Sequence, residues 1–108
     1  MPNVYYNPEK FDLEIVACLD EDNLSYEYNT FIVLKHNPSG RLFYADSQGC
    51  SCPTPFEEYH FKGPDDTNLI EIKTDNFDPF VTELENWCKG AKIKSDEMDD
   101  VIKSVKGR

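Results

Sequence analysis

The sequence has no long apolar run, few cysteines and few basic residues, and each shortage excludes a class of protein. No stretch approaches the roughly 20 apolar residues of a membrane-spanning helix, and the first ten residues lack the apolar core of a secretory signal. We therefore expect a cytoplasmic protein without a membrane partner. Four cysteines among 108 residues are too sparse for a disulfide scaffold, and a reducing cytoplasm disfavours structural disulfides.

The common motifs of catalysis are also missing from the sequence. It contains no glycine-rich phosphate loop with a lysine, no Gly-x-Ser-x-Gly elbow and no His-Glu-x-x-His pair. Carboxylates abound, but in an acidic domain they most often form a solvated face. The sequence therefore favours a protein that is not an enzyme and that has no cofactor.

Negative charge is the main feature of the composition. The chain has 21 acidic and 11 basic residues, for a net charge of −10. Residues 1–78 carry all of it, with 15 acidic and 5 basic residues, while residues 79–108 carry six of each. Such a domain repels phosphate backbones, so we expect no direct binding to nucleic acid. The charge suits a basic protein partner, or it serves solubility alone.

The length and the hydrophobic content predict a single globular domain over residues 1–108. Hydrophobic residues make up 39% of the chain and aromatic residues 13%. We divide the chain into a β-meander at 1–48, a cysteine- and proline-rich loop at 49–68, and a short strand with two helices at 69–108. Strands before helices are typical of an α+β fold.

Three strands are expected in the first half of the chain. Leu13, Ile15, Ala17 and Leu19 alternate along residues 13–20, which predicts a strand with one buried face. Residues 25–36 are apolar on both faces at their centre, as in a central strand. A Pro-containing turn at 37–40 then leads to a return strand at 41–45, which completes an antiparallel meander.

The last third of the chain predicts a short fourth strand at 69–72 and two helices that pack on one face of the sheet. Asp78 and Pro79 begin the first helix and Gly90 ends it, whereas Ser95 caps the second, and Asn7 caps an earlier helical turn at 8–11. The apolar stripes of the two helices comprise Phe80, Leu84, Trp87, Cys88, Met98, Val101, Ile102 and Val105.

The segment Gly-Cys-Ser-Cys-Pro-Thr-Pro-Phe-Glu at 49–57 leaves several chemistries open. Cys50 and Cys52 with His60 are the best candidates for zinc, but their spacing is one residue shorter than that of the usual zinc motif. A redox disulfide between the two cysteines would close a strained ring. A nucleophilic thiolate would need a more positive environment than this acidic loop supplies. We therefore expect no metal site.

A stiff recognition loop accounts for most features of the same segment. Thiols two positions apart can bury together in an extended chain, and the prolines stiffen the exit. Tyrosines offer a large contact area at a small entropic cost, and carboxylates attract basic partners. The expected binding residues are Tyr44, Asp46, Glu57, Glu58 and Tyr59.

Three segments, at 7–11, 25–26 and 49–57, form a pattern within residues 5–59, and the last of them is the most specific. With this pattern the chain resembles a family of small uncharacterised proteins from phages of actinobacteria. Asp12 stands where that family more often has glycine, so the entry into the first strand can differ. The resemblance implies a phage origin and a cytoplasmic setting, and it implies no mechanism.

Three functions follow as alternatives from the sequence. The first is an acidic, non-catalytic phage protein that binds a host or phage protein and so antagonises a host system. The second is a small thiol or zinc protein that acts through Cys50 and Cys52. The third is a structural subunit of a homo-oligomer.

Overall fold

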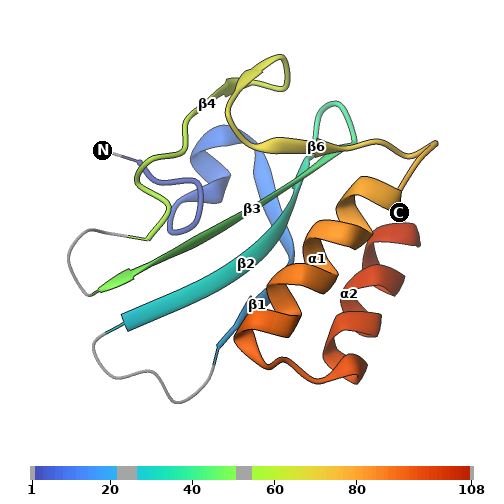
Figure 1. The fold of residues 1–108 in the computed structure, drawn as a ribbon. Helices are drawn as coiled ribbons and strands as arrows, with labels where there is room; N and C mark the ends of the chain where they lie inside the picture. Colours follow the sequence, from blue (N-terminus) through green and yellow to red (C-terminus); the bar gives the residue numbers. More distant parts are fainter. Residues whose placement is uncertain (1, 22–26, 51–54, 108) are drawn as a thin grey trace.

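The computed structural model describes residues 2–21, 27–50 and 55–107, and it forms a four-stranded antiparallel sheet followed by two helices (Figure 1). The strand order is β1-β2-β3-β6, so the first three strands form the expected meander. The predicted α+β fold is confirmed. The elements are a 3₁₀ helix at Pro8–Phe11, β1 at Leu13–Asp20, β2 at Glu27–His36, β3 at Arg41–Cys50, β4 at Phe61–Gly63, β5 at Asp66–Thr67, β6 at Ile70–Ile72, α1 at Asp78–Ala91 and α2 at Ser95–Lys106.

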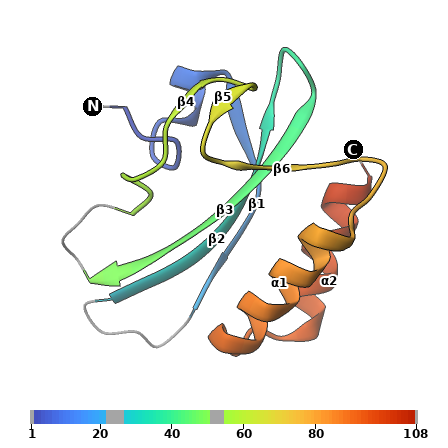
Figure 2. The ribbon, with the colours of Figure 1, turned by 45° about the horizontal axis from the view of Figure 1, so that its top comes forward.

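Both faces of the sheet are covered, as the apolar centre of β2 predicted. Alternate side chains of β2 point to opposite faces, so Phe31 and Val33 belong to one core while Ile32 and Leu34 belong to the other. The helix-side core is closed by α1 and α2, and the far-side core is closed by the chain before β1 and by residues 55–69 (Figure 2). None of the helices in these described ranges is long and apolar enough to cross a membrane.

A β-bulge divides β1 between the two cores. The pairing with β2 shifts between Ile15 and Ala17, so that Val16 is an extra residue. Leu13 and Ile15 pack in the far-side core, whereas Ala17 and Leu19 pack in the helix-side core. The prediction of one buried face for these four residues was therefore wrong, because one extra residue reverses the alternation.

The helix ends differ in detail from the prediction. Helix α1 continues through Gly90 to Ala91 and stops at Lys92, which adopts a left-handed φ of 58°. Asp78 is the first helical residue, not a cap, and Ser95 makes no capping hydrogen bond. Asn7 does not cap the 3₁₀ helix, because its side-chain oxygen accepts a hydrogen bond from the backbone of Asn3.

The expected loop at 49–68 contains more regular structure than the sequence suggested. Gly49 and Cys50 are the last residues of β3, and β4 pairs with β5 to form a small second sheet. Arg41 fastens this region to the main sheet, since its guanidinium donates to Glu71, Asp65 and the carbonyl of Pro64. The short strand expected at 69–72 is present as β6 and pairs with β3.

Candidate binding groove

Asn3 ties the segment before β1 to the far side of the sheet. Its Oδ1 accepts hydrogen bonds from the backbone N–H groups of Tyr5 at 2.7 Å and Tyr6 at 3.1 Å, which fold a local turn. Its Nδ2 donates to the carbonyl of Pro55 at 2.9 Å, across 52 positions of the chain. One amide side chain therefore fixes two distant segments against each other.

The opposite segment, residues 55–62, is anchored by Phe56. Its side chain is fully buried, and its backbone has a φ of 64°, which is unusual for a residue with a bulky side chain. The backbone N–H of Phe56 donates to the buried hydroxyl of Ser47 at 3.2 Å, and its carbonyl accepts from Tyr59 at 3.2 Å. The burial and these bonds hold a tight turn that leaves Glu57 and Glu58 exposed.

Asn68 fixes the next part of this segment. Its Oδ1 accepts from the backbone N–H of His60 at 2.8 Å, and its Nδ2 donates to the carbonyl of Glu58 at 3.0 Å. Thr67 adds a hydroxyl bond to the carbonyl of His60 at 2.6 Å. Residues 58–60 are thus held by the last side chain of β5 and by the side chain that follows it, although they belong to no strand themselves.

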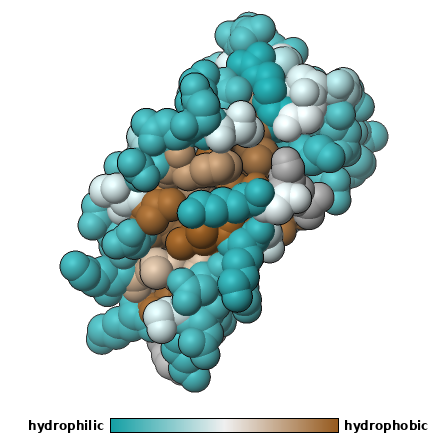
Figure 3. All heavy atoms as spheres, turned by 90° about the vertical axis from the view of Figure 1, so that its right-hand side faces the viewer, coloured by the Kyte–Doolittle hydropathy of each residue, from teal (hydrophilic) through white to brown (hydrophobic). Residues whose placement is uncertain are grey.

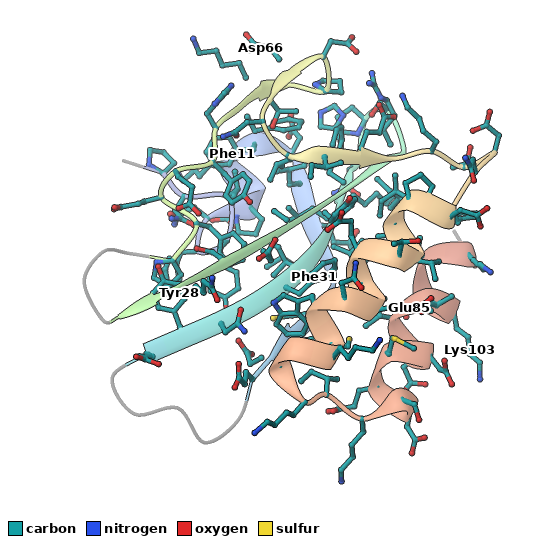
Figure 4. All side chains as sticks on the ribbon, viewed as in Figure 1. Phe11, Tyr28, Phe31, Asp66, Glu85 and Lys103 are labelled. Atoms are coloured by element: carbon teal, nitrogen blue, oxygen red, sulfur yellow. The ribbon has the colours of Figure 1, made fainter. Side chains whose placement is uncertain are left out.

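A groove runs between these two segments, and we call it the N-terminal groove. It consists of two adjoining cavities of about 350 and 800 Å³ that share Pro2, Glu57 and Tyr59. The larger cavity is mainly apolar, since it is lined by Phe11, Tyr59 and Phe61 besides Pro2, and it carries Glu57 and Glu58 with His60 and Lys62 at its polar positions. Figure 4 places Phe11 on the side of the sheet away from the helices, beside the strand β4. The groove can therefore accept an apolar group, with Glu57 and Glu58 available to a positive charge and Lys62 to a negative one.

Two tyrosines of the segments that form the groove walls, Tyr59 and Tyr5, have raised pKa values. The hydroxyl of Tyr59 donates a hydrogen bond of 2.9 Å to the carbonyl of Asp46. Burial raises the pKa of Tyr59, and the negative charges of Asp46 and Glu58 raise it further. Burial also raises the pKa of Tyr5 to about 12, with smaller contributions from Cys18 and Asp20. Tyr59 lines the groove as a neutral aromatic side chain whose hydroxyl is already bonded, whereas Tyr5 packs against Phe56.

The structure brings together three of the five predicted binding residues. Glu57, Glu58 and Tyr59 line the N-terminal groove. Tyr44 lies on the other face of the sheet, is only 6% exposed, and stacks on Phe31 with a centroid separation of 5.6 Å. It is therefore not part of the same surface.

Asp46 meets the groove only through its backbone carbonyl. Its carboxyl follows Tyr44 by two positions and so belongs to the helix-covered face of β3. Burial, followed by the charges of Glu83 and Glu58, raises the pKa of this carboxyl. The residue thus positions Tyr59 and contributes negative potential, but its side chain does not line the groove.

The predicted thiol chemistry falls largely outside the part of the chain that the structure describes. Ser51 and Cys52 lie outside it, as does the side chain of Cys50, and His60 lies at the groove with its Nε2 3.8 Å from an oxygen of Asp66. The other two cysteines are free thiols whose pKa is raised by burial, Cys18 on β1 and Cys88 on α1. Within the described ranges no cluster of three or more potential ligands could hold a metal ion.

Sequence reasoning missed the N-terminal wall of the groove. Pro2, Asn3 and Phe11 line or organise it, and Phe61 supplies its floor. An asparagine side chain often accepts hydrogen bonds from backbone N–H groups a few residues later, and this folds a local turn. The turn at Asn3 could therefore have been anticipated from the sequence. The bond to Pro55 could not, because it depends on how the chain folds back on itself.

The fold and the groove define a small α+β domain with an acidic, partly apolar surface depression. A family model described as a domain of unknown function (DUF7574) matches residues 2–106, and the chain belongs to this family. The match covers both walls of the groove and both helices. Neither the curated proteins nor the solved structures contain a match to the chain.

Proposed function

We propose that this chain is an acidic, non-catalytic binding protein of phage origin that docks a basic segment of a host or phage protein in its N-terminal groove. The partner segment presents one or two apolar side chains next to lysine or arginine. Such binding would take place in the host cytoplasm, where it would antagonise a host system. The single observation that carries the proposal is an apolar groove rimmed by Glu57 and Glu58 in a chain of net charge −10.

The composition of the groove supports a protein partner. The centres of protein interfaces are rich in aromatic side chains, and here Phe11, Tyr59 and Phe61 lie together. Tyr59 has the rigid, amphipathic side chain that recurs at binding hot spots. Because the walls are fixed by Asn3 and Asn68, little ordering entropy is lost when a ligand binds.

The charge supports a basic partner. Glu57 and Glu58 are exposed at the groove, and the nearby carboxyl of Asp46 adds to the negative potential. A negative site of this kind accelerates the encounter with a positive patch, most strongly at low salt. The phage origin is supported by the resemblance of residues 5–59, above all by the segment at 49–57.

Charge reversal at the groove tests the proposal. The chain, immobilised through its C-terminus, is used to capture proteins from actinobacterial lysate, with and without phage infection. The variant Glu57→Lys with Glu58→Lys is compared with Glu85→Lys with Asp99→Lys, which changes the net charge equally at exposed positions on α1 and α2. Circular dichroism verifies that both variants are folded.

We expect to find a protein that binds the wild type and the helix variant (Glu85→Lys with Asp99→Lys). The same protein should be lost from the groove variant (Glu57→Lys with Glu58→Lys). With that protein purified, its affinity should fall as salt rises, and the groove variant should show a flatter dependence. Equal retention by both variants would refute the groove as the binding site. Retention that depends on nucleic acid, and disappears with nuclease, would refute a protein partner.

A further inference from the structure

The outer edge of β1 forms a second exposed surface, separate from the N-terminal groove. β1 is the edge strand of the sheet, eight residues long, and it pairs only with β2. In the described part of the chain, no backbone hydrogen bond reaches the side of β1 that faces away from β2. Unpaired strand edges are templates for a further strand, and proteins normally cover or charge them.

The backbone groups that point outward follow from the ladder. The N–H of Glu21 donates to the carbonyl of Asn29, so this pair is hydrogen-bonded, and the pattern alternates along an antiparallel ladder. Leu19 therefore bonds to β2, whereas the N–H and C=O groups of Cys18 and Asp20 point away from the sheet. An extended chain could add to this edge without disturbing β2.

A shallow groove with both polar and apolar walls runs alongside this edge. It has a volume of about 250 Å³ and lies between β1 and α2. Val16, Ala17, Leu19 and Val101 supply its apolar floor, and the polar residues Glu97, Asp100 and Ser104 rim it along α2. Figure 3, which shows the right-hand side of the molecule as drawn in Figure 1, has hydrophobic side chains exposed between hydrophilic ones. We call the outer edge of β1 and this groove together the β1 edge site.

The charges around the β1 edge site select its occupant. Glu14 and Asp20 lie near the two ends of β1, and Glu97 and Asp100 rim the groove. If two copies paired through β1 about a two-fold axis, the carboxylates of one copy would approach those of the other, which is unfavourable. A segment with lysine or arginine would meet complementary charge instead.

We infer that the β1 edge site binds an extended basic segment of a partner protein, which adds as a fifth strand beside β1. Its backbone pairs with the outward groups of Cys18 and Asp20. Alternate apolar side chains enter the groove between β1 and α2, and basic side chains reach Glu97 and Asp100. Main-chain pairing supplies affinity, while the groove and its carboxylates supply specificity.

A display library of random peptides of about eight to ten residues tests this inference on the whole chain. Five variants, single or double, are compared with the wild type in binding assays with the selected peptides. Cys18→Pro removes the backbone N–H that points away from β2, and an edge strand tolerates proline at such a position. Cys18→Ala, which keeps this N–H, is the matched control. The double variant Glu97→Lys and Asp100→Lys reverses the charge of the groove rim. Its control is the double variant Glu85→Lys and Asp99→Lys, which changes the net charge by the same amount.

We expect selection of peptides in which apolar β-branched residues alternate with lysine or arginine. Their affinity should fall at least about tenfold in Cys18→Pro and in the rim variant, and it should be retained in both controls and in Glu57→Lys with Glu58→Lys. If Cys18→Pro does not fold, the rim variant decides alone. Failure to enrich such peptides, or unchanged binding to the rim variant, would overturn the inference. A dimer in sedimentation that the rim variant strengthens would overturn it in favour of a second copy.

Discussion

The indole Nε1 of Trp87 donates a hydrogen bond of 2.9 Å to Oδ1 of Asn29, which joins α1 to β2. The same indole packs against Phe31 at a centroid distance of 5.6 Å, and Figure 4 shows Phe31 between the sheet and α1. Polar and apolar contacts of one side chain thus fix the position of the helix on the sheet.

Replacement of Trp87 should therefore have a graded effect. We expect Trp87→Ala to lower the free energy of unfolding by about 3 kcal/mol, since it removes a partly buried aromatic side chain from the helix-side core. Trp87→Phe should cost about 1 kcal/mol, because it loses the bond to Asn29 but keeps much of the packing. Urea unfolding followed by circular dichroism measures both values. A loss below about 1 kcal/mol for Trp87→Ala would show that α1 is held by other contacts.

Ser47 should prove important for the N-terminal groove although it does not line it. Its hydroxyl accepts from the N–H of Phe56 and donates to Glu58. Ser47→Ala leaves a buried N–H without its partner, so we expect a loss of about 1–2 kcal/mol in urea unfolding. We also expect the amide resonances of residues 56–59 to shift in NMR spectra, while those of α1 stay unchanged. Shifts spread evenly over the chain would argue against a local role.

Asn3 provides a second test of the groove walls. Asn3→Ala removes the bond to Pro55 and the two bonds that fold the turn at Tyr5 and Tyr6. Amide hydrogen exchange of residues 3–7 should accelerate at least about tenfold, since their protection then comes from a weaker local structure. Asn7→Ala, which loses one bond to the same turn, is the matched control and should have a smaller effect.

The ion pair of Arg41 with Glu71 predicts a pH dependence of stability. The hydrogen bonds from Arg41 lower the pKa of Glu71 from 4.5 to about 2, so the carboxylate stabilises the fold above pH 4.5, and this contribution disappears as the pH falls towards about 2. At pH 7, Glu71→Gln should lower the free energy of unfolding by about 1 kcal/mol. The difference between variant and wild type should shrink steadily below pH 4.5. A difference that stays constant down to pH 2 would assign the cost to packing.

The thiols at 50 and 52 can be tested without knowledge of their structure. We expect the circular dichroism spectrum and the unfolding midpoint to stay the same in excess chelator, because the described residues already form a core on each face of the sheet. Cooperative loss of structure at stoichiometric chelator would instead establish the zinc alternative. Native mass spectrometry of the untreated protein gives an independent answer through its mass and subunit number.

The sequence predicted those parts of the fold that depend on local pattern. The two-sided apolar centre of β2 and the stripe Phe80, Leu84 and Cys88 of α1 reflect which side chains must leave water, and the structure buries them as expected. The bulge at Val16 could not be read in the same way. It arises from the pairing of β1 with β2, and a single shifted residue changes the face of every side chain after it.

The N-terminal groove shows more clearly that a local sequence pattern does not predict tertiary contacts. Glu57, Glu58 and Tyr59 were predicted because they are close in sequence and have suitable chemistry. The other residues of the groove, Pro2 and Phe11, lie near the N-terminus, far from Glu57 in the sequence. Only tertiary contacts, such as the bond of Asn3 to Pro55, bring the two segments together. Tyr44 was grouped with them because it is near them in the sequence. The alternation of side chains along β3 instead directs it to the face of the sheet that the helices cover.

The position of Pro2 has a practical consequence for the design of fusion proteins. Pro2 lines both cavities of the N-terminal groove, so a tag or a carrier protein attached ahead of Met1 would begin at the mouth of the proposed binding site. The last turn of α2 lies on the other side of the molecule (Figures 1 and 2). Affinity handles, fluorophores and surface-coupling groups therefore belong after residue 107, and a partner screen with an N-terminal fusion would block the surface that it is meant to probe.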